Sequence, residues 1–139
     1  MERVSSQRML AVAALAFAAV FVWSVFSPGS PTLPPPPGTP GMPRLLQLGA
    51  DDCMFCQVMA PFLEELKREQ QGRIEIVYLD ASRNPELLQQ YHADGYPVQF
   101  FYDAKGRLLL RHDGFIPKDE ILATFEKHGV SLAPWRREK

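Results

Sequence analysis

The chain's only two cysteines, Cys53 and Cys56, are separated by two residues. They follow an apolar run, Leu45, Leu46 and Leu48, that predicts a short buried strand. After them, apolar residues recur at helical spacing: Val58, Met59, Phe62, Leu63 and Leu66. Cys53 is therefore predicted to lie at the N-terminus of a helix. There, free backbone N–H groups and the positive end of the helix dipole favour a thiolate.

This arrangement suits thiol–disulfide exchange. A Cys53 thiolate would attack a disulfide and form a mixed disulfide, and the thiol of Cys56, one turn further along, would then displace the product. The cysteine pair itself carries the two electrons, so the chemistry requires no cofactor. Met54 and Phe55 lie between the cysteines and are predicted to be exposed, as an apolar rim that suits a protein partner.

Two other uses of the cysteine pair are weaker interpretations. A structural bridge between residues three apart in a helix would constrain almost no chain. A metal site would need further ligands from His92, His112 and His128, but the pattern places all three in other segments. His92 and His128 fall near predicted helix ends, where a histidine complements the helix dipole. No metal site is predicted.

Length, cysteine count and net charge limit the classes of protein to which the chain can belong. The 139 residues allow one domain with additional segments, and two cysteines are too few for a disulfide framework. The formal net charge of −1 gives no indication of a nucleic-acid partner.

The N-terminus predicts a membrane anchor. Residues 1–8 are short and polar, and residues 9–27 are apolar and carry no charge. The apolar run Met9 to Phe26 would extend about 27 Å as a helix, close to the thickness of a bilayer core. A cleaved signal peptide is the alternative, but Pro28 spoils the best cleavage site, which favours an uncleaved anchor or signal.

The distribution of basic residues predicts the orientation of this anchor. Arg3 and Arg8 precede the apolar segment, and no basic residue follows it until Arg44. The positive-inside rule then keeps residues 1–8 in the cytoplasm and places the C-terminal part on the periplasmic or extracellular side. The prediction is a single-pass protein of the inner, or cytoplasmic, membrane.

Residues 28–43 are half proline, with four consecutive prolines at 34–37. Such a segment forms no packed structure and is predicted to be a semi-rigid polyproline II linker. It would hold the following domain away from the bilayer.

Residues 44–130 alternate between strand and helix patterns, and residues 131–139 form a tail. After the first strand, the elements expected are a helix to about Gln71, a strand over Arg73–Leu79, a helix capped by Asn84 and closed by Gly95, a strand over Val98–Tyr102, a hairpin turn at Asp103–Gly106, a strand over Arg107–Asp113, and a helix from Pro117 to Gly129. This β-α-β-α-β-β-α order predicts an α/β fold with a four-stranded mixed sheet flanked by helices.

The segment from Leu45 to Val130 resembles the thioredoxin family. The resemblance rests on Cys53-Met54-Phe55-Cys56, Pro61 in the following helix, Tyr96-Pro97 before a buried strand, and Gly114 after the hairpin. It implies a minimal thioredoxin-like fold, a redox-active disulfide between Cys53 and Cys56, and a cis peptide bond at Pro97. It also implies that Tyr96 and Pro97 bind substrate, with the backbone of Tyr96 pairing with an extended peptide.

The sequence departs from the family in ways that affect the chemistry. Asp52 stands where the most familiar member has tryptophan, and Gln47 replaces a buried acid thought to assist proton transfer. Glutamine cannot accept a proton, so another base or water must serve Cys56. The carboxylates of Asp51 and Asp52 would oppose a thiolate that the helix terminus favours. The family's extra N-terminal strand and helix are also missing.

The resemblance and the N-terminal segment together predict a membrane-anchored thiol–disulfide oxidoreductase that acts on exported proteins. Reduction of protein disulfides, or electron relay, is the leading direction, and net oxidation stays open. Net reduction outside the cytoplasm would need a membrane-embedded thiol electron donor as a partner. The alternative is an anchored binding module, a holdase or metal chaperone, whose thiols are not catalytic.

Overall fold

The computed structural model describes residues 33–34 and 37–134. The predicted cytoplasmic segment 1–8 and the anchor 9–27 lie outside these residues, as does part of the linker 28–43. In the part of the chain that the structure describes, no helix is both long and apolar enough to cross a membrane.

The elements follow the predicted β-α-β-α-β-β-α order. They are β1 (Arg44–Gly49), α2 (Met54–Glu69), β2 (Glu75–Asp80), α3 (Glu86–Gln90), β3 (Val98–Tyr102), β4 (Leu108–Asp113) and α4 (Lys118–Lys127). The strands form one sheet in the order β2-β1-β3-β4. β1 is parallel to β2 and antiparallel to β3, and β3 is antiparallel to β4. The predicted mixed sheet is confirmed.

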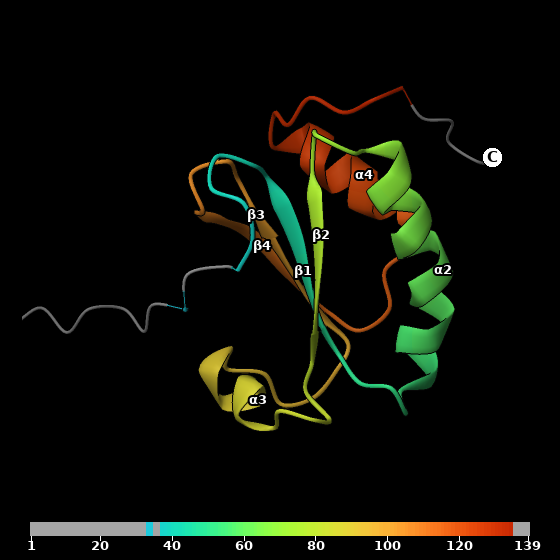
Figure 1. Ribbon diagram of the computed structural model, residues 1–139, viewed down its shortest axis with the longest axis vertical. Helices are drawn as coiled ribbons and strands as arrows, with labels where there is room; N and C mark the ends of the chain where they lie inside the picture. Colours follow the sequence, from blue (N-terminus) through green and yellow to red (C-terminus); the bar gives the residue numbers. More distant parts are fainter. Residues whose placement is uncertain (1–32, 35–36, 135–139) are drawn as a thin grey trace, which may run out of the picture. The chain divides into compact units, whose positions relative to one another are not determined.

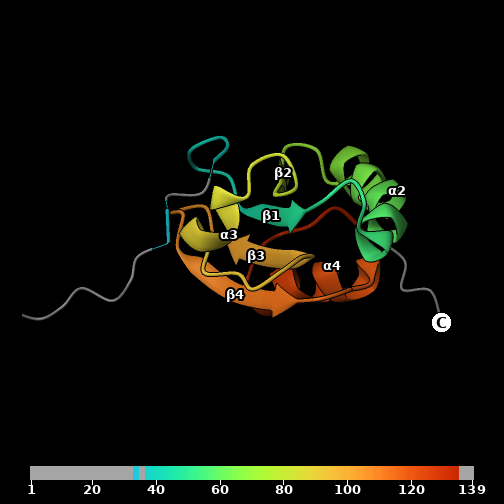
Figure 2. The ribbon, with the colours of Figure 1, turned by 90° about the horizontal axis from the view of Figure 1, so that it is seen from below.

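Helices cover both faces of this sheet. α2 and α4 lie on one face and α3 lies on the other, as Figure 1 and the turned view in Figure 2 show. The α2/α4 face buries one apolar cluster: Leu45, Met59, Leu63, Leu66, Ile74, Phe101, Ile116, Ile121, Leu122 and Phe125. The α3 face buries another: Leu46, Leu48, Ala81, Tyr91, Ala93, Val98, Phe100 and Tyr102. The central strand β1 contributes to both clusters because its side chains alternate between the faces.

One row of residues on the α2/α4 face is polar. Gln47 of β1 lies opposite Tyr78 of β2 and opposite Gln99 of β3. Gln99 in turn lies opposite His112 of β4. Directly opposed residues share a face of a sheet, so these four side chains form a band that we call the polar row. It runs close to the end of β1 that leads into the cysteines.

The short helix α3 differs from its prediction. Pro85, not Asn84, is the N-cap residue, and it forms no side-chain cap. The Asn84 amide instead donates to the carbonyl oxygen of Asp80 (3.1 Å). The side chain predicted to cap the helix therefore stabilises the turn after β2. The predicted end at Gly95 is also wrong, since α3 ends at Gln90 and His92 takes a positive φ of 50°.

The other elements lie within a few residues of their predicted bounds. α2 contains Pro61 and ends at Glu69, because Gln70 turns the chain by accepting hydrogen bonds from the backbone of Arg73 and Ile74. Gly106 takes the positive φ expected in the hairpin, at 76°. In α4 the residues predicted to face inward are buried: Ile121, Leu122 and Phe125.

Segments on either side of the predicted domain contact it. The buried Arg44 guanidinium donates to the carbonyl oxygens of Pro37 (3.0 Å), Thr39 (2.6 Å) and Met42. The Gln70 side chain binds the backbone of Ala133, accepting from its N–H at 2.8 Å. The last described residues of the linker and the first residues of the tail are therefore held against the sheet and α2.

Candidate redox site

Cys53 is the N-cap residue of α2. Its backbone is extended, with φ of −86° and ψ of 115°, and its Sγ accepts a hydrogen bond from the backbone N–H of Cys56 at 3.2 Å. The predicted position at a helix N-terminus is confirmed. The sulfur therefore lies where free helix N–H groups and the positive end of the dipole can interact with it.

The two sulfurs have different environments. Both cysteines are free thiols, and Cys53 keeps 9% of its surface exposed whereas Cys56 keeps 4%. Burial raises the pKa of Cys56 to about 12, and a hydrogen bond with Cys53 acts in the same direction. Cys56 is therefore a protonated thiol at neutral pH, placed next to a sulfur that accepts a helix N–H.

An apolar rim surrounds the cysteines. Met54 and Phe55 are 71% and 54% exposed, as predicted, and Val58 is exposed on the next turn of α2. Phe115 joins this rim, because its ring lies 6.3 Å from that of Phe55 and 6.2 Å from that of Phe62. Sequence reasoning missed Phe115. The sequence signal for Phe115 is an aromatic residue directly after Gly114, in a segment that belongs to neither a strand nor a helix.

Tyr96 and Pro97 lie beside the cysteines. Their peptide bond is cis, as the resemblance implied, and the carbonyl oxygen of Pro97 accepts from the N–H of Gly114 at 2.8 Å. The charge of Asp52 raises the pKa of the Tyr96 phenol, and the cysteines contribute in the same direction, so this ring lies near them. The backbone of Tyr96 makes no hydrogen bond with any residue that the structure describes.

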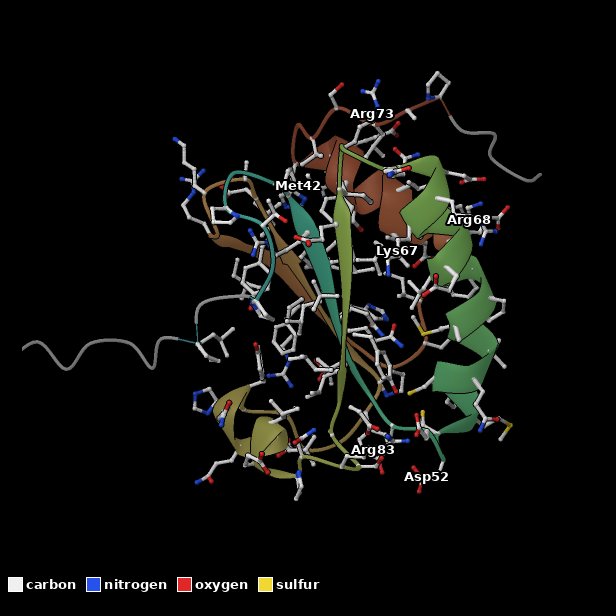
Figure 3. The ribbon with its side chains drawn as sticks, viewed as in Figure 1. Met42, Asp52, Lys67, Arg68, Arg73 and Arg83 are labelled. Carbon is white, nitrogen blue, oxygen red and sulfur yellow. The ribbon has the colours of Figure 1, made fainter. Side chains whose placement is uncertain are left out.

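The two acids before Cys53 are not equivalent. Arg83 pairs with Asp51 at 2.7 Å and with Asp80 at 3.0 Å, which ties the loop after β2 to the loop before α2. Figure 3 shows Asp52 and Arg83 at the same end of the sheet. Asp52 forms no salt bridge within the described residues. The charge of Asp51 is thus balanced, and Asp52 is the acid that opposes a thiolate at Cys53.

A cavity of about 340 Å³ lies behind the site, between α2 and β2. It is lined by Gln47, Ala50, Asp51, Cys56, Gln57, Ala60, Leu63, Glu64, Lys67, Ile76 and Tyr78. Lys67 extends from α2 toward the sheet in Figure 3. Tyr78 reaches across Gly49, where a Cβ atom would come within 2.7 Å of its ring. Sequence reasoning identified Gln47 but not this cavity, since a cavity depends on how side chains from separate elements pack.

The three histidines do not join the cysteines. The ring of His112 lies 3.1 Å from the carbonyl oxygen of Phe115, and that of His128 lies 2.8 Å from that of Thr124. Among the residues described, no group of three or more metal-ligating side chains comes together.

Comparison with known proteins identifies the family. The thioredoxin family model matches residues 41–127, which include both cysteines, Tyr96-Pro97 and the whole sheet. The chain belongs to the thioredoxin family. Thioredoxins of Staphylococcus aureus strains are 29% identical to it over 85 residues, which is 61% of this chain and 81% of theirs.

Solved structures support the same fold. A thioredoxin-2 described as a component of the malaria parasite protein secretion machinery matches with a TM-score of 0.60 and 21% identity, over 66% of this chain and 87% of its own. A thioredoxin-like protein from Clostridium perfringens matches with a TM-score of 0.56 and 24% identity, over 73% and 82% of the two chains. As a thioredoxin-family member, the chain is, at the general level, a thiol–disulfide oxidoreductase.

Proposed function

We propose that this protein is a membrane-anchored thiol–disulfide oxidoreductase that reduces disulfides of exported proteins. The observation that carries the redox part is the Sγ of Cys53, which accepts a hydrogen bond from the first turn of α2. Cys53 is the nucleophile because its sulfur accepts the N–H of Cys56 at the start of α2 and is the more exposed of the two. Cys56, buried and protonated, is the resolving thiol.

The reaction has two steps. The Cys53 thiolate attacks one sulfur of a substrate disulfide, which forms a mixed disulfide and releases the other substrate sulfur as a thiolate. The Cys56 thiolate then attacks the Sγ of Cys53. This forms the Cys53–Cys56 disulfide and releases the second substrate thiolate. The substrate gains two electrons and the cysteine pair loses two, so each cycle needs a donor that reduces the pair again.

The substrate is proposed to be an extended protein segment. The unpaired backbone of Tyr96 offers hydrogen bonds to a strand-like peptide, and Pro97 holds it next to Gly114. Met54, Phe55 and Phe115 supply an apolar surface for the side chains of that segment.

Insulin-disulfide reduction by the full-length chain tests this activity. The wild-type protein should precipitate reduced insulin, and Cys53→Ser should abolish this. Cys56→Ser should retain the attack and accumulate a mixed disulfide, because the second step is missing. Wild-type protein without activity, or activity that persists in Cys53→Ser, would contradict the proposal.

The location rests on the sequence alone. The uncharged segment 9–27, with Arg3 and Arg8 before it, supports an uncleaved anchor with the domain on the periplasmic or extracellular side, and a membrane-embedded thiol donor is proposed to reduce Cys53–Cys56. Labelling intact cells with a membrane-impermeant maleimide should modify Cys53. Labelling only after cell lysis would contradict this location.

A further inference from the structure

Asp52 carries a carboxylate beside the redox site without an ionic partner. It is exposed, immediately precedes Cys53, and forms no salt bridge within the described residues. In Figure 3 it lies at the outer end of the loop that leads into α2. Its charge is the main cause of the raised pKa of the Tyr96 phenol. The carboxylate therefore lies on the side of Cys53 where Tyr96 is proposed to bind a substrate segment.

The arginines at this end of the sheet are already paired with other acids. The strand ends and loops there carry the carboxylates of Asp51, Asp52, Asp80, Asp94 and Asp113 and the guanidinium groups of Arg83 and Arg111. Arg83 binds Asp51 at 2.7 Å and Asp80 at 3.0 Å. Arg111 binds Asp113 at 2.7 Å. Neither guanidinium group therefore remains for the acid that precedes the first cysteine, and the excess of carboxylates makes this end of the described residues negative.

A free carboxylate at this position opposes the reaction unless the substrate brings a positive charge. Asp52 repels the thiolate that Cys53 forms. A lysine or arginine next to the substrate cystine would bind Asp52 as the peptide extends along Tyr96, and its charge would offset that repulsion. An acidic flanking residue would add to the repulsion. Two unit charges about 4 Å apart in water change a rate or binding constant by about fivefold, which is enough to select among substrates.

We propose that Asp52 is a specificity-determining residue and that the protein acts preferentially on disulfides flanked by lysine or arginine. This inference rests on the proposed function, because it names the class of substrate for the attack by Cys53. In that step the Cys53 thiolate bonds to one substrate sulfur, the substrate S–S bond breaks, and the other sulfur leaves as a thiolate. Asp52 exchanges no electrons or protons in this step and influences only which disulfide is held next to Cys53.

Matched peptides test this selectivity on the reduced, full-length chain. Three disulfide-linked peptides of equal length differ only in the two residues that flank the cysteine, which are lysine, glutamine or glutamate. Acid quenching and mass spectrometry give the rate at which the reduced protein is consumed. Each rate is divided by that of the same peptide with 2-mercaptoethanol, which corrects for the intrinsic reactivity of the disulfide.

The corrected rate should be at least about fivefold higher for the lysine peptide than for the glutamate peptide, with the glutamine peptide between them. This preference should shrink as the ionic strength rises from about 0.01 M to about 1 M, because the Debye length falls from about 30 Å to about 3 Å.

Two variants of Asp52 change the charge in opposite degrees. Asp52→Asn should lower the ratio of the lysine-peptide rate to the glutamate-peptide rate by at least about threefold, and Asp52→Lys should reverse the preference. The ratio isolates the effect of charge on selectivity, because a change in the reactivity of Cys53 itself alters the rates for all peptides by the same factor.

Glu120→Gln is the matched control, because it removes one negative charge far from Cys53. Glu120 is exposed on α4, two residues after Lys118, which pairs with Glu65 and Glu69 in the second half of α2. Glu65 lies about 18 Å along the helix from Cys53, well beyond the Debye length of about 8 Å at physiological ionic strength. At that ionic strength the ratio should stay within about 1.5-fold of wild type.

The outcomes distinguish this inference from the proposed function. Equal corrected wild-type rates for the three peptides, or a ratio that Asp52→Asn leaves unchanged, would overturn the role of Asp52 while the proposed function stands. An equal fall of the ratio in Glu120→Gln would also overturn it, because the selectivity would then come from the net charge of the chain. No attack on any peptide by the wild-type protein would contradict the proposed function, and this inference with it.

Discussion

The two faces of the sheet differ in composition and packing, although alternate residues of the same strands form both of them. On the α3 face, β1 places Leu46 and Leu48 in a cluster that is closed and almost entirely apolar. On the α2/α4 face, the same strand places Leu45 in an apolar cluster but Gln47 beside a cavity that reaches Cys56. Both faces therefore contribute apolar packing, but the cysteine end of the α2/α4 face is less well packed and places polar groups next to the thiols.

This difference locates the less well packed part of the fold, which lies around the cysteines. The two cysteines and Ala50 form a small cluster of their own, separate from both large clusters. Buried polar atoms without a partner among the described residues gather mainly in Gln47 and Gln99, directly across the sheet from each other. If the comparison holds, substitutions on the α3 face should change stability, and substitutions near the cavity should change chemistry.

The largest expected effect is on the α3 face. Leu48 is fully buried there, so Leu48→Ala should lower the free energy of unfolding by about 2–5 kcal/mol through lost burial and a new cavity. The rates of thiol exchange in the folded protein should not change. Urea denaturation measures the stability, and Leu108→Ala, at a leucine that is 43% exposed on β4, is the control and should change it by less than about 0.5 kcal/mol. Equal losses in both variants would contradict the assignment of this face.

A smaller effect is expected where Gly49 meets Tyr78. A Cβ atom at Gly49 would lie 2.7 Å from the Tyr78 ring and 2.9 Å from its hydroxyl oxygen, so Gly49→Ala should push that ring away from the cavity. Because the Tyr78 ring is 45% exposed and is the far end of its side chain, it can move aside, and we expect a loss of about 1 kcal/mol or less in the free energy of unfolding. In the Tyr78→Ala background the same substitution should have little effect, because the clash is gone. Additive losses in this double-mutant cycle would contradict the contact.

The loss of stability at alkaline pH should depend on the ionisation of the Cys56 thiol. Burial raises its pKa from 9.0 to about 12, so above pH 9 the unfolded chain loses this proton while the folded chain retains it. The stability of the reduced protein is therefore fully present below pH 9 and falls as the pH rises toward 12. Urea midpoints measured between pH 8 and 11 under reducing conditions should decline from about pH 9 in wild type.

Cys56→Ala is the control for this decline. Tyr102, on the α3 face, and Tyr78 both have a pKa raised from 10.0 to about 12, chiefly by burial. The variant should therefore hold its midpoint up to about pH 10, where the tyrosines begin to act. The same decline from pH 9 in Cys56→Ala would show that another group is responsible.

Much of the fold could be predicted because local pattern and tertiary structure agree. The dense apolar run of β3, the helical spacing of Ile121, Leu122 and Phe125, and the glycine at 106 each indicate the conformation that the structure has. The end of α3 could not be predicted, because His92 rather than a glycine takes the positive φ there.

The site divides in the same way. Cys53 at the helix cap, exposed Met54 and Phe55, and Tyr96-Pro97 beside them follow from sequence spacing or family resemblance. The contact of Phe115 with Phe55 and the Arg83–Asp51 pair could not be predicted, because each joins segments that are far apart in the chain. The cavity could not be predicted, because it depends on two small residues, Gly49 and Ala50, and on the position of the Tyr78 side chain beside them.

The smallest expected effect tests whether an unpartnered polar atom matters by itself. The hydroxyl of Tyr102 is buried on the α3 face and has no hydrogen-bond partner among the described residues, as is true of the Gln47 amide on the opposite face. Tyr102→Phe removes that atom without changing the shape of the ring, so the free energy of unfolding at pH 7 should stay level or rise by up to about 1 kcal/mol.

Its kinetic result completes the comparison of the two faces. Both steps of thiol exchange should keep their wild-type rates in Tyr102→Phe, because this hydroxyl lies among the α3-face residues and away from the cavity. Gln47→Met also removes unpartnered polar atoms, so its stability should likewise stay level or rise, but Gln47 lies beside the cavity that Cys56 lines, and this variant should change the rate of the resolving step. If Tyr102→Phe slowed resolution as well, the contrast between the α3 face and the cysteine end of the α2/α4 face would be wrong, since polarity anywhere in the sheet would then influence Cys56.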